Sequence, residues 1–362
     1  MNNSHLAFSY TPHLMFEADE VWHHGREPVL RRMSNGDLVS IFYSGGRTEP
    51  DPSNIAAIIR SSDDGLTWTK PRRVFSHDTR CVYATEIFMG GIRPMAAVQT
   101  YEFGGYFSEF RACFSLSDDN GVTWGEPFTV KGVPPNFCVR QGRTLSDGTW
   151  LVPVYWVEQD AGWNFDLRKE GISGIRGWRF SCAVIRSSDS GERFTLSGYQ
   201  AHPVGFWEPD VLEVSPGHLI MFIRCDKGGV LWRCDSLDYG LSWSPAVPTE
   251  IPNSGTKVTL FQIEGKTVLA HNPTPSGRKI LELWVSDDGC ITWERKIRLA
   301  EIQSSESLSI IEPATKLGNW TTDIICYPHG FPDEERRLLY LACDAVHAHY
   351  LLKIPFTDIV GK

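Results

Sequence analysis

Short apolar segments alternate with polar, glycine-containing turns along most of the chain. One set of apolar runs includes IAAIIRSS, RACFSLS, SCAVIRSS and ILELWVS. A second set forms hairpin patterns around polar or Gly turns, namely MSNGDLVSIFY, LSDGTWLVPVY, VSPGHLIMFIR and IEGKTVLAHNP. Runs of this length, bounded by turn residues, are typical of buried strands. Two hairpins in succession predict a four-stranded antiparallel sheet, and the order recurs along the chain.

A short repeat, Ser-x-Asp-x-Gly-x-Thr-Trp, lies directly after the first set of strands. Two copies match it fully, two diverge near the end, and the last, which begins at Asp287, reaches its Trp with one extra residue. The five copies are Ser61–Trp68, Ser117–Trp124, Ser187–Phe194, Ser236–Trp243 and Asp287–Trp293. The Asp can accept hydrogen bonds from turn amides, the Gly allows a positive φ, and the aromatic residue can pack beneath the turn. The repeat therefore predicts a hairpin turn at each copy.

The repeat units predict an all-β fold, a six-bladed β-propeller. They are spaced by about 50 to 70 residues, which suits four-stranded blades with insertions in their loops. Five copies fit six blades if one blade lacks a copy, and Glu334–Pro355 supplies strands for the last blade. We expect the two chain ends to pair and close the ring, so that residues 1–362 form a single domain.

Composition and charge exclude several classes of function. The formal net charge of −9 is spread without acidic or basic blocks, which argues against a nucleic acid or a membrane surface as partner. The nine cysteines are scattered without CxxC pairs, so we interpret them as small core residues and expect no metal site. No cofactor is implied either. The absence of a leader pattern or a membrane-length apolar stretch predicts a cytoplasmic protein.

Three arginines stand at comparable places near the ends of the inner strands, where a propeller holds its ligand. They are Arg26, Arg224 and Arg278. Each alone is compatible with a solvated strand edge. Together they predict a carboxylate clamp, because guanidinium groups bind carboxylate in a planar, bidentate manner.

With these motifs, the whole chain resembles the sialidase (neuraminidase) superfamily of Asp-box, or BNR-repeat, glycosidases. That family has an arginine triad whose first member lies in an Arg-x-Pro motif, which Arg26 matches. The second follows a glutamate-bearing strand, as Arg224 follows the strand of Glu208. The third follows an Asn-Pro pair, as Arg278 does.

The resemblance also implies catalytic residues. Asp51 is the best match to the family's acid and base, with Glu49 as the alternative, and Arg47 resembles an arginine beside that acid. Tyr327, in a Tyr-Pro pair, resembles the nucleophile, and Glu208 would be its partner. A phenol suits this role because a carboxylate nucleophile would be repelled by a substrate carboxylate at the anomeric carbon.

The resemblance implies an exo-acting, retaining glycoside hydrolase that releases a terminal sialic acid or a related acidic sugar. A hydrolase or lyase acting on uronic-acid-type glycans is an alternative, since three arginines bind any carboxylate. A carbohydrate-binding propeller without catalysis is another, since a scaffold does not determine its function. Hydrolysis is favoured if Tyr327 and Glu208 lie beside the arginines.

Overall fold

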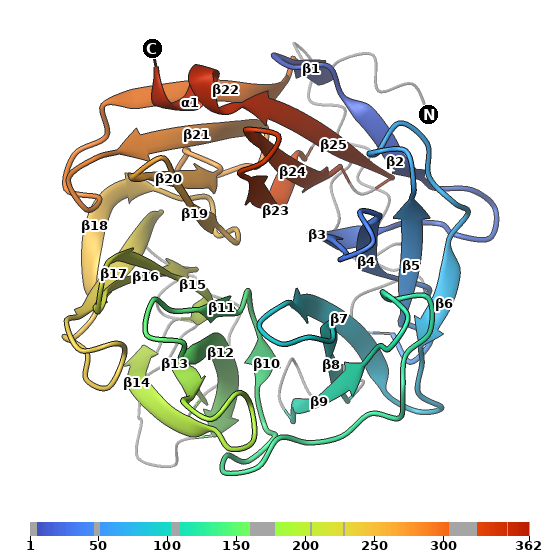
Figure 1. The fold of residues 1–362 in the computed structure, drawn as a ribbon, viewed down its shortest axis with the longest axis horizontal. Coiled ribbons are helices and arrows are strands. Elements are labelled where there is room, and N and C mark those ends of the chain that lie inside the picture. Colours follow the sequence, from blue (N-terminus) through green and yellow to red (C-terminus); the bar gives the residue numbers. More distant parts are fainter. Residues whose placement is uncertain are drawn as a thin grey trace. The chain divides into compact units, whose positions relative to one another are not determined.

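The computed structural model describes residues 6–46, 51–102, 109–159, 178–202, 205–226, 229–303, 324–345 and 347–361. Contacts divide the chain into two compact units. Unit 1 contains residues 1–84 and 259–362, and unit 2 contains residues 85–258. The described residues form six antiparallel sheets, three with most of their strands in each unit (Figure 1).

Unit 1 brings the beginning and the end of the chain into common sheets. The first sheet contains β3 (Arg26–Arg32), β4 (Leu38–Ser44), β5 (Ile55–Ser61) and β6 (Arg72–Phe75). The second contains β2 (His13–Glu17), β25 (Ala348–Pro355), β24 (Leu338–Asp344) and β23 (Cys326–Asp333). The third contains β1 (Leu6–Phe8), β22 (Arg295–Ile302), β21 (Ile280–Ser286), β20 (Lys266–His271) and β19 (Thr259–Ile263). A short helix, α1 (Phe356–Val360), follows β25.

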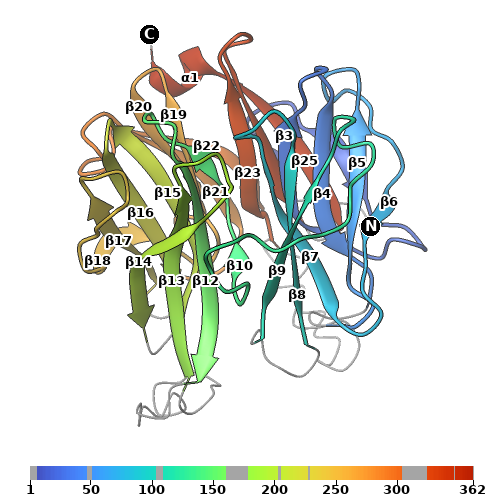
Figure 2. The ribbon, with the colours of Figure 1, turned by 60° about the horizontal axis from the view of Figure 1, so that its bottom comes forward.

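Unit 2 repeats the same up-and-down order of strands. Its first sheet contains β7 (Cys81–Phe88), whose first residues fall in unit 1, with β8 (Met95–Tyr101) and β9 (Arg111–Leu116). The next contains β10 (Cys138–Val139), β11 (Arg143–Thr144), β12 (Trp150–Gln159), β13 (Trp178–Ser187) and β14 (Thr195–His202). The last contains β15 (Phe206–Ser215), β16 (His218–Cys225), β17 (Val230–Ser236) and β18 (Val247–Pro252). Figure 2 shows the long pair β12 and β13 running side by side.

Apolar side chains fill the space between neighbouring sheets of one unit. In unit 1, a cluster that includes Leu30, Phe42 and Leu351 joins the sheet of β3 to the sheet of β25. The middle strand β4 is buried along all seven residues, because its two faces both meet apolar neighbours. Burial of each large apolar side chain contributes about 1.5–3 kcal/mol, so these cores hold the inner strands firmly.

The two chain ends pair as the sequence predicted. In unit 1, β2 runs beside β25 (Figure 1). His13 of β2 lies opposite Leu351 of β25. Glu334–Pro355 supplies β24 and β25, and the sheet that they form lacks a repeat turn. Both predictions are confirmed.

Each repeat forms a hairpin turn between the third and fourth strands of its sheet, or follows β9. In the first, Ser61 Oγ donates to Asp63 at 2.7 Å and accepts from the Gly65 amide at 2.8 Å. The prediction of an extra residue in the fifth copy was wrong. Asp288 is its turn aspartate, and Cys290 occupies the glycine position with φ 63°. The spacing is therefore regular, and glycine stands one residue earlier than in the other copies.

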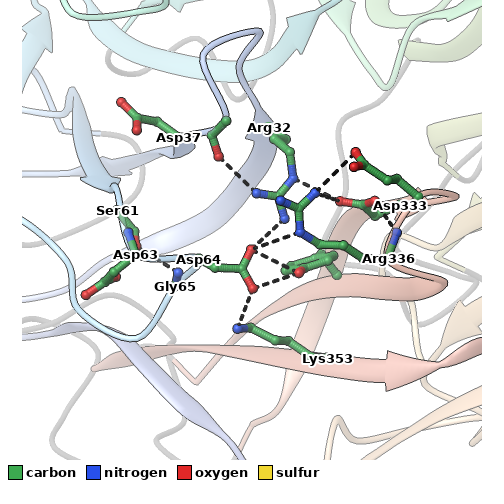
Figure 3. A network of polar contacts seen from close by, with 12 residues as sticks. Arg32, Asp37, Ser61, Asp63, Asp64, Gly65, Asp333, Arg336 and Lys353 are labelled. Carbon is green, nitrogen blue, oxygen red and sulfur yellow. Dashed lines mark hydrogen bonds and ion pairs between the residues drawn. The ribbon is translucent and has the colours of Figure 1, made fainter.

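A network of ionic groups links the first repeat turn to the last two strands of unit 1 (Figure 3). Asp64 accepts hydrogen bonds from Arg32 at 2.7 Å, from the Tyr340 hydroxyl at 2.8 Å and from Lys353 at 2.9 Å. Burial raises the pKa of Asp64, but the hydrogen bonds from Lys353, Arg32 and Tyr340 outweigh it and lower that pKa to about 2. The Asp64 carboxylate thus ties sequence positions almost 300 residues apart.

The described cysteines are free, and all but the half-buried Cys113 are buried, which confirms their interpretation as small core residues. Among the described residues, no helix has the length and apolar character needed to cross a membrane.

We predict that Asp64→Asn lowers the free energy of unfolding at pH 6 by roughly 1–2 kcal/mol, at the low end for charged hydrogen bonds because the carboxylate is 37% exposed. The folded-state pKa is depressed, so this stabilisation is present above the unfolded pKa near 4 and is lost as the pH falls toward 2. Urea unfolding of both proteins from pH 6 to pH 2.5 measures the difference. A gap that stays constant over this range would contradict the assignment.

Candidate active site

Two arginines lie beside Tyr327 within unit 1. The guanidinium carbon of Arg26 is 5.4 Å from the centre of the Tyr327 ring, and that of Arg278 is 5.2 Å from it. These distances fall within the range of cation–π contact. The structure therefore brings together three residues that the sequence separates by about 250 and 50 positions.

Arg26 is held in place by a buried carboxylate. Its Nε donates to Asp344 Oδ2 at 2.7 Å, and the two side chains are 4% and 0% exposed. The same oxygen accepts the backbone amide of Glu27 at 3.2 Å. Removing one member of such a buried pair leaves an unbalanced charge. The hydrogen bond between the two side chains also fixes the direction of the guanidinium group.

The segment that carries Arg278 is tied to Ile325, the residue that directly precedes β23. The Ile325 amide donates to the Arg278 carbonyl at 2.7 Å. The Asn272 amide group donates to the carbonyls of Ile325 and Ile280, at 2.8 and 2.6 Å. These bonds place the arginine next to Tyr327, which lies two residues beyond Ile325.

The neighbouring thiol is a poor nucleophile. Burial, with a smaller contribution from Asp344, raises the pKa of Cys326 to about 12, so the thiol stays protonated at neutral pH. Tyr327 is thus the better candidate of the two for covalent chemistry.

Unit 2 contains a second cluster, centred on Glu208. Its carboxylate is ion-paired with Arg140 through one oxygen and accepts from Arg224 through the other, at 2.7 Å. Glu208 and Arg140 are buried, and the buried Lys257 adds positive charge nearby. Burial raises the pKa of Glu208, but Arg140 and Arg224 outweigh it and hold that pKa well below its usual range. Glu208 is therefore ionised at neutral pH.

Arg224 is oriented by a further carboxylate. Its Nη2 donates to Asp226 at 3.0 Å, and the Trp207 indole donates to the other oxygen of Asp226 at 2.7 Å. Trp207 also lies opposite Arg224 in the pairing of β15 with β16. The glutamate and arginine that the sequence motif links thus make direct contact.

Asp51 lies in the turn between β4 and β5. Its carboxylate accepts the Ser53 amide at 2.8 Å, and its own amide donates to Asn54 at 2.9 Å. These bonds give the turn a defined shape and leave Asp51 partly exposed. Arg47 and Glu49, the other predicted residues of this loop, lie outside the described residues.

Sequence reasoning missed Arg140 and Asp344, although both are charged partners of predicted site residues. Arg140 follows the two-residue strand β10 and belongs to no repeat or motif. Asp344 ends the apolar strand sequence LLYLACD. A charge at the end of an otherwise apolar strand was the available signal, because such a charge requires a partner once it is buried.

Comparison with known proteins defines the class to which this fold belongs. The Hadza microbial sialidase Hz136 superposes with a TM-score of 0.70 at 16% identity, covering 96% of this chain and 69% of that one. This likeness shows an all-β, six-bladed β-propeller fold, as the repeats predicted. A family model described as a BNR repeat-like domain matches residues 96–321, and the chain belongs to this family.

Two curated relatives are sialidases. The sialidase of Clostridium perfringens is 25% identical over 274 residues, which are 67% of this chain and 66% of that protein. The sialidase of Bacteroides fragilis (strain YCH46) is 24% identical over 200 residues, which are 51% of this chain and 33% of that protein. The predicted relationship to the sialidase superfamily is confirmed, and this chain spans between a third and two thirds of these relatives.

We predict that Arg140→Met lowers the free energy of unfolding by about 3 kcal/mol, because it leaves part of the Glu208 charge unbalanced in a buried site. The double variant Arg140→Met with Glu208→Gln should recover part of this loss, since the unbalanced charge is then gone. Urea unfolding at pH 7 measures both. Strictly additive losses would show that the two side chains do not interact.

Proposed function

We propose that this chain is an exo-acting, retaining glycoside hydrolase that releases a terminal sialic acid or a related acidic sugar. The observation that carries the proposal is the contact of two arginines with the ring of Tyr327. The two relatives add support for the substrate class, because both are sialidases. In this proposal Arg26, Arg224 and Arg278 bind the substrate carboxylate by charge-assisted hydrogen bonds.

The first step forms a bond between the Tyr327 oxygen and the anomeric carbon while the glycosidic bond breaks. Glu208 receives the phenol proton, and Asp51 donates a proton to the leaving oxygen. Two nearby guanidinium groups assist by stabilising negative charge on the phenol oxygen.

In the second step a water molecule attacks the anomeric carbon from the side vacated by the leaving group. Asp51 accepts the water proton, and the Tyr327 oxygen leaves and takes its proton back. Two displacements at one carbon retain the configuration of the sugar.

The low pKa of Glu208 limits its role as a proton acceptor in these two reaction steps. A carboxylate held by two arginines is a weak proton acceptor, so it supports the attack chiefly when negative charge on the phenol oxygen is already stabilised by Arg26 and Arg278. The proposal requires Glu208 and Tyr327 to serve the same substrate molecule.

Loss of the nucleophile tests the mechanism directly. We predict that Tyr327→Phe lowers kcat on a fluorogenic sialoside by roughly 1,000-fold or more, while binding of a nonhydrolysable sialic acid analogue changes little. Tyr350→Phe, which changes a half-buried tyrosine of β25 whose ring packs against Phe8, is the matched control and should retain full turnover. Unchanged turnover by Tyr327→Phe would reject the mechanism. Binding of the acidic sugar without any turnover by the unsubstituted protein would instead favour a binding propeller.

The role of Asp51 predicts a dependence on the leaving group. Asp51→Asn should lower kcat/KM by roughly 100- to 10,000-fold for a sialoside whose leaving group is a sugar hydroxyl. The loss should be much smaller for a phenol-type leaving group, which departs with little protonation. Equal losses for the two substrates would contradict a general acid at this position.

The arginine clamp predicts an effect on binding. Arg278→Ala should raise KM for carboxylated substrates by roughly 10- to 100-fold, the range expected for charge-assisted hydrogen bonds. Arg278→Lys keeps the positive charge but loses the planar guanidinium group, so its KM should lie between those of the unsubstituted protein and Arg278→Ala. A KM unchanged by Arg278→Ala would remove this residue from the clamp.

A further inference from the structure

Three inner strands share one local backbone feature. Among the described residues, the non-glycine residues that have a positive φ inside a strand are Glu27, Glu208 and Tyr327, with φ of 51°, 46° and 51°. Each is followed by a proline, namely Pro28, Pro209 and Pro328. Two of the three side chains are those to which we assign chemistry in the proposed function.

The three sites are also equivalent in strand register. In each, the pairing with the next strand shifts by one residue across the X-Pro pair, as in a β-bulge. The shifts lie between Arg26 and Val29 on β3, between Trp207 and Asp210 on β15, and between Cys326 and His329 on β23. A side chain at the same bulge position points in the same direction relative to its own strand. Glu27 therefore projects from β3 in the direction in which Glu208 projects from β15 and Tyr327 projects from β23.

This backbone conformation is unfavourable on its own. A non-glycine residue in the left-handed region costs of order 1–3 kcal/mol, and a following proline restricts the backbone further. Such strain persists where the surrounding structure enforces it, and it gathers at functional sites. A third copy of the bulge therefore points to a third functional side chain.

Glu27 also lies next to the Tyr327 cluster within unit 1. The strands β3 and β23 run side by side, and the Leu30 amide donates to His329 Nδ1 at 3.1 Å. The backbone amide of Glu27 donates to the same Asp344 oxygen that holds Arg26. The residue is 9% exposed, so its carboxylate belongs to an enclosed environment.

We propose that Glu27 is a specificity-determining residue that accepts a hydrogen bond from a ring or side-chain hydroxyl of the acidic sugar. This inference rests on the proposed function. A glutamate carboxylate accepts hydrogen bonds and repels other anions, so it cannot serve the substrate carboxylate that Arg26 and Arg278 attract. It selects sugars that present a hydroxyl donor at this place and opposes sugars that present a second anionic group there.

Equilibrium binding of an unsaturated, nonhydrolysable sialic acid analogue and of its monodeoxy derivatives tests this inference. In the unsubstituted protein, we expect one derivative to bind roughly 10- to 100-fold more weakly than the parent. Glu27→Gln should weaken binding of the parent and reduce the difference between the parent and that derivative, because a neutral amide oxygen accepts a weaker hydrogen bond than a carboxylate. Glu27→Asn is a second variant, because asparagine adopts the left-handed backbone readily and tolerates this bulge. Glu17→Gln, an exposed change on β2, is the matched control and should bind the whole series as the unsubstituted protein does.

Distinct results separate this inference from the proposed function. If the parent analogue binds tightly and the penalty of every deoxy derivative survives in both Glu27 variants, the role of Glu27 is wrong and the proposed function stands. If the parent does not bind to the unsubstituted protein, the proposed function fails and this inference fails with it. A thermal unfolding curve for each variant shows whether a loss of binding reflects a loss of the fold.

Discussion

The need to balance charge in enclosed surroundings governs both clusters. A buried arginine or glutamate is costly unless an opposite charge and hydrogen bonds accompany it. Asp344 meets this need for Arg26, while Arg140 and Arg224 meet it for Glu208. The partners also fix directions, so each cluster is organised before any ligand arrives. Pre-organisation of this kind is what allows charged groups to act on a reacting centre without first rearranging.

The fold holds these charged side chains in place because they lie on tightly packed strands. Apolar clusters join neighbouring sheets within a unit, and repeat turns with internal hydrogen bonds close hairpins. The bulges then place Glu208 and Tyr327 in strained conformations that a loosely packed strand would relax. Scaffold stability and site geometry are therefore linked, because the same inner strands provide both.

Much of the fold could be predicted from the sequence because its signals are local. A turn aspartate, a glycine and an aromatic residue at regular spacing predict a hairpin wherever they occur, and the pairing of the chain ends follows from the closure of the predicted ring. Cys290 shows where such a pattern fails. The backbone forms the same turn with a non-glycine residue in the left-handed position. Matching the fifth repeat to the others on its glycine, which stands one residue earlier, therefore gave the wrong spacing. The candidate site was harder, because ion pairs such as that of Arg140 with Glu208 join residues 68 positions apart and leave no local pattern. The X-Pro pairs at the bulges are visible in the sequence, but their common backbone conformation is visible only in the structure.

The central claim is that Tyr327 attacks an acidic sugar at its anomeric carbon. A sialosyl fluoride that carries a second fluorine beside the anomeric carbon tests this most directly, because that fluorine destabilises the positively charged transition state and slows turnover of the intermediate. Intact mass measurement after brief incubation, followed by peptide mapping, should show one fluorosialosyl group attached to the Tyr327 oxygen. Attachment to another residue, or no attachment by a protein that hydrolyses sialosides, would contradict the account.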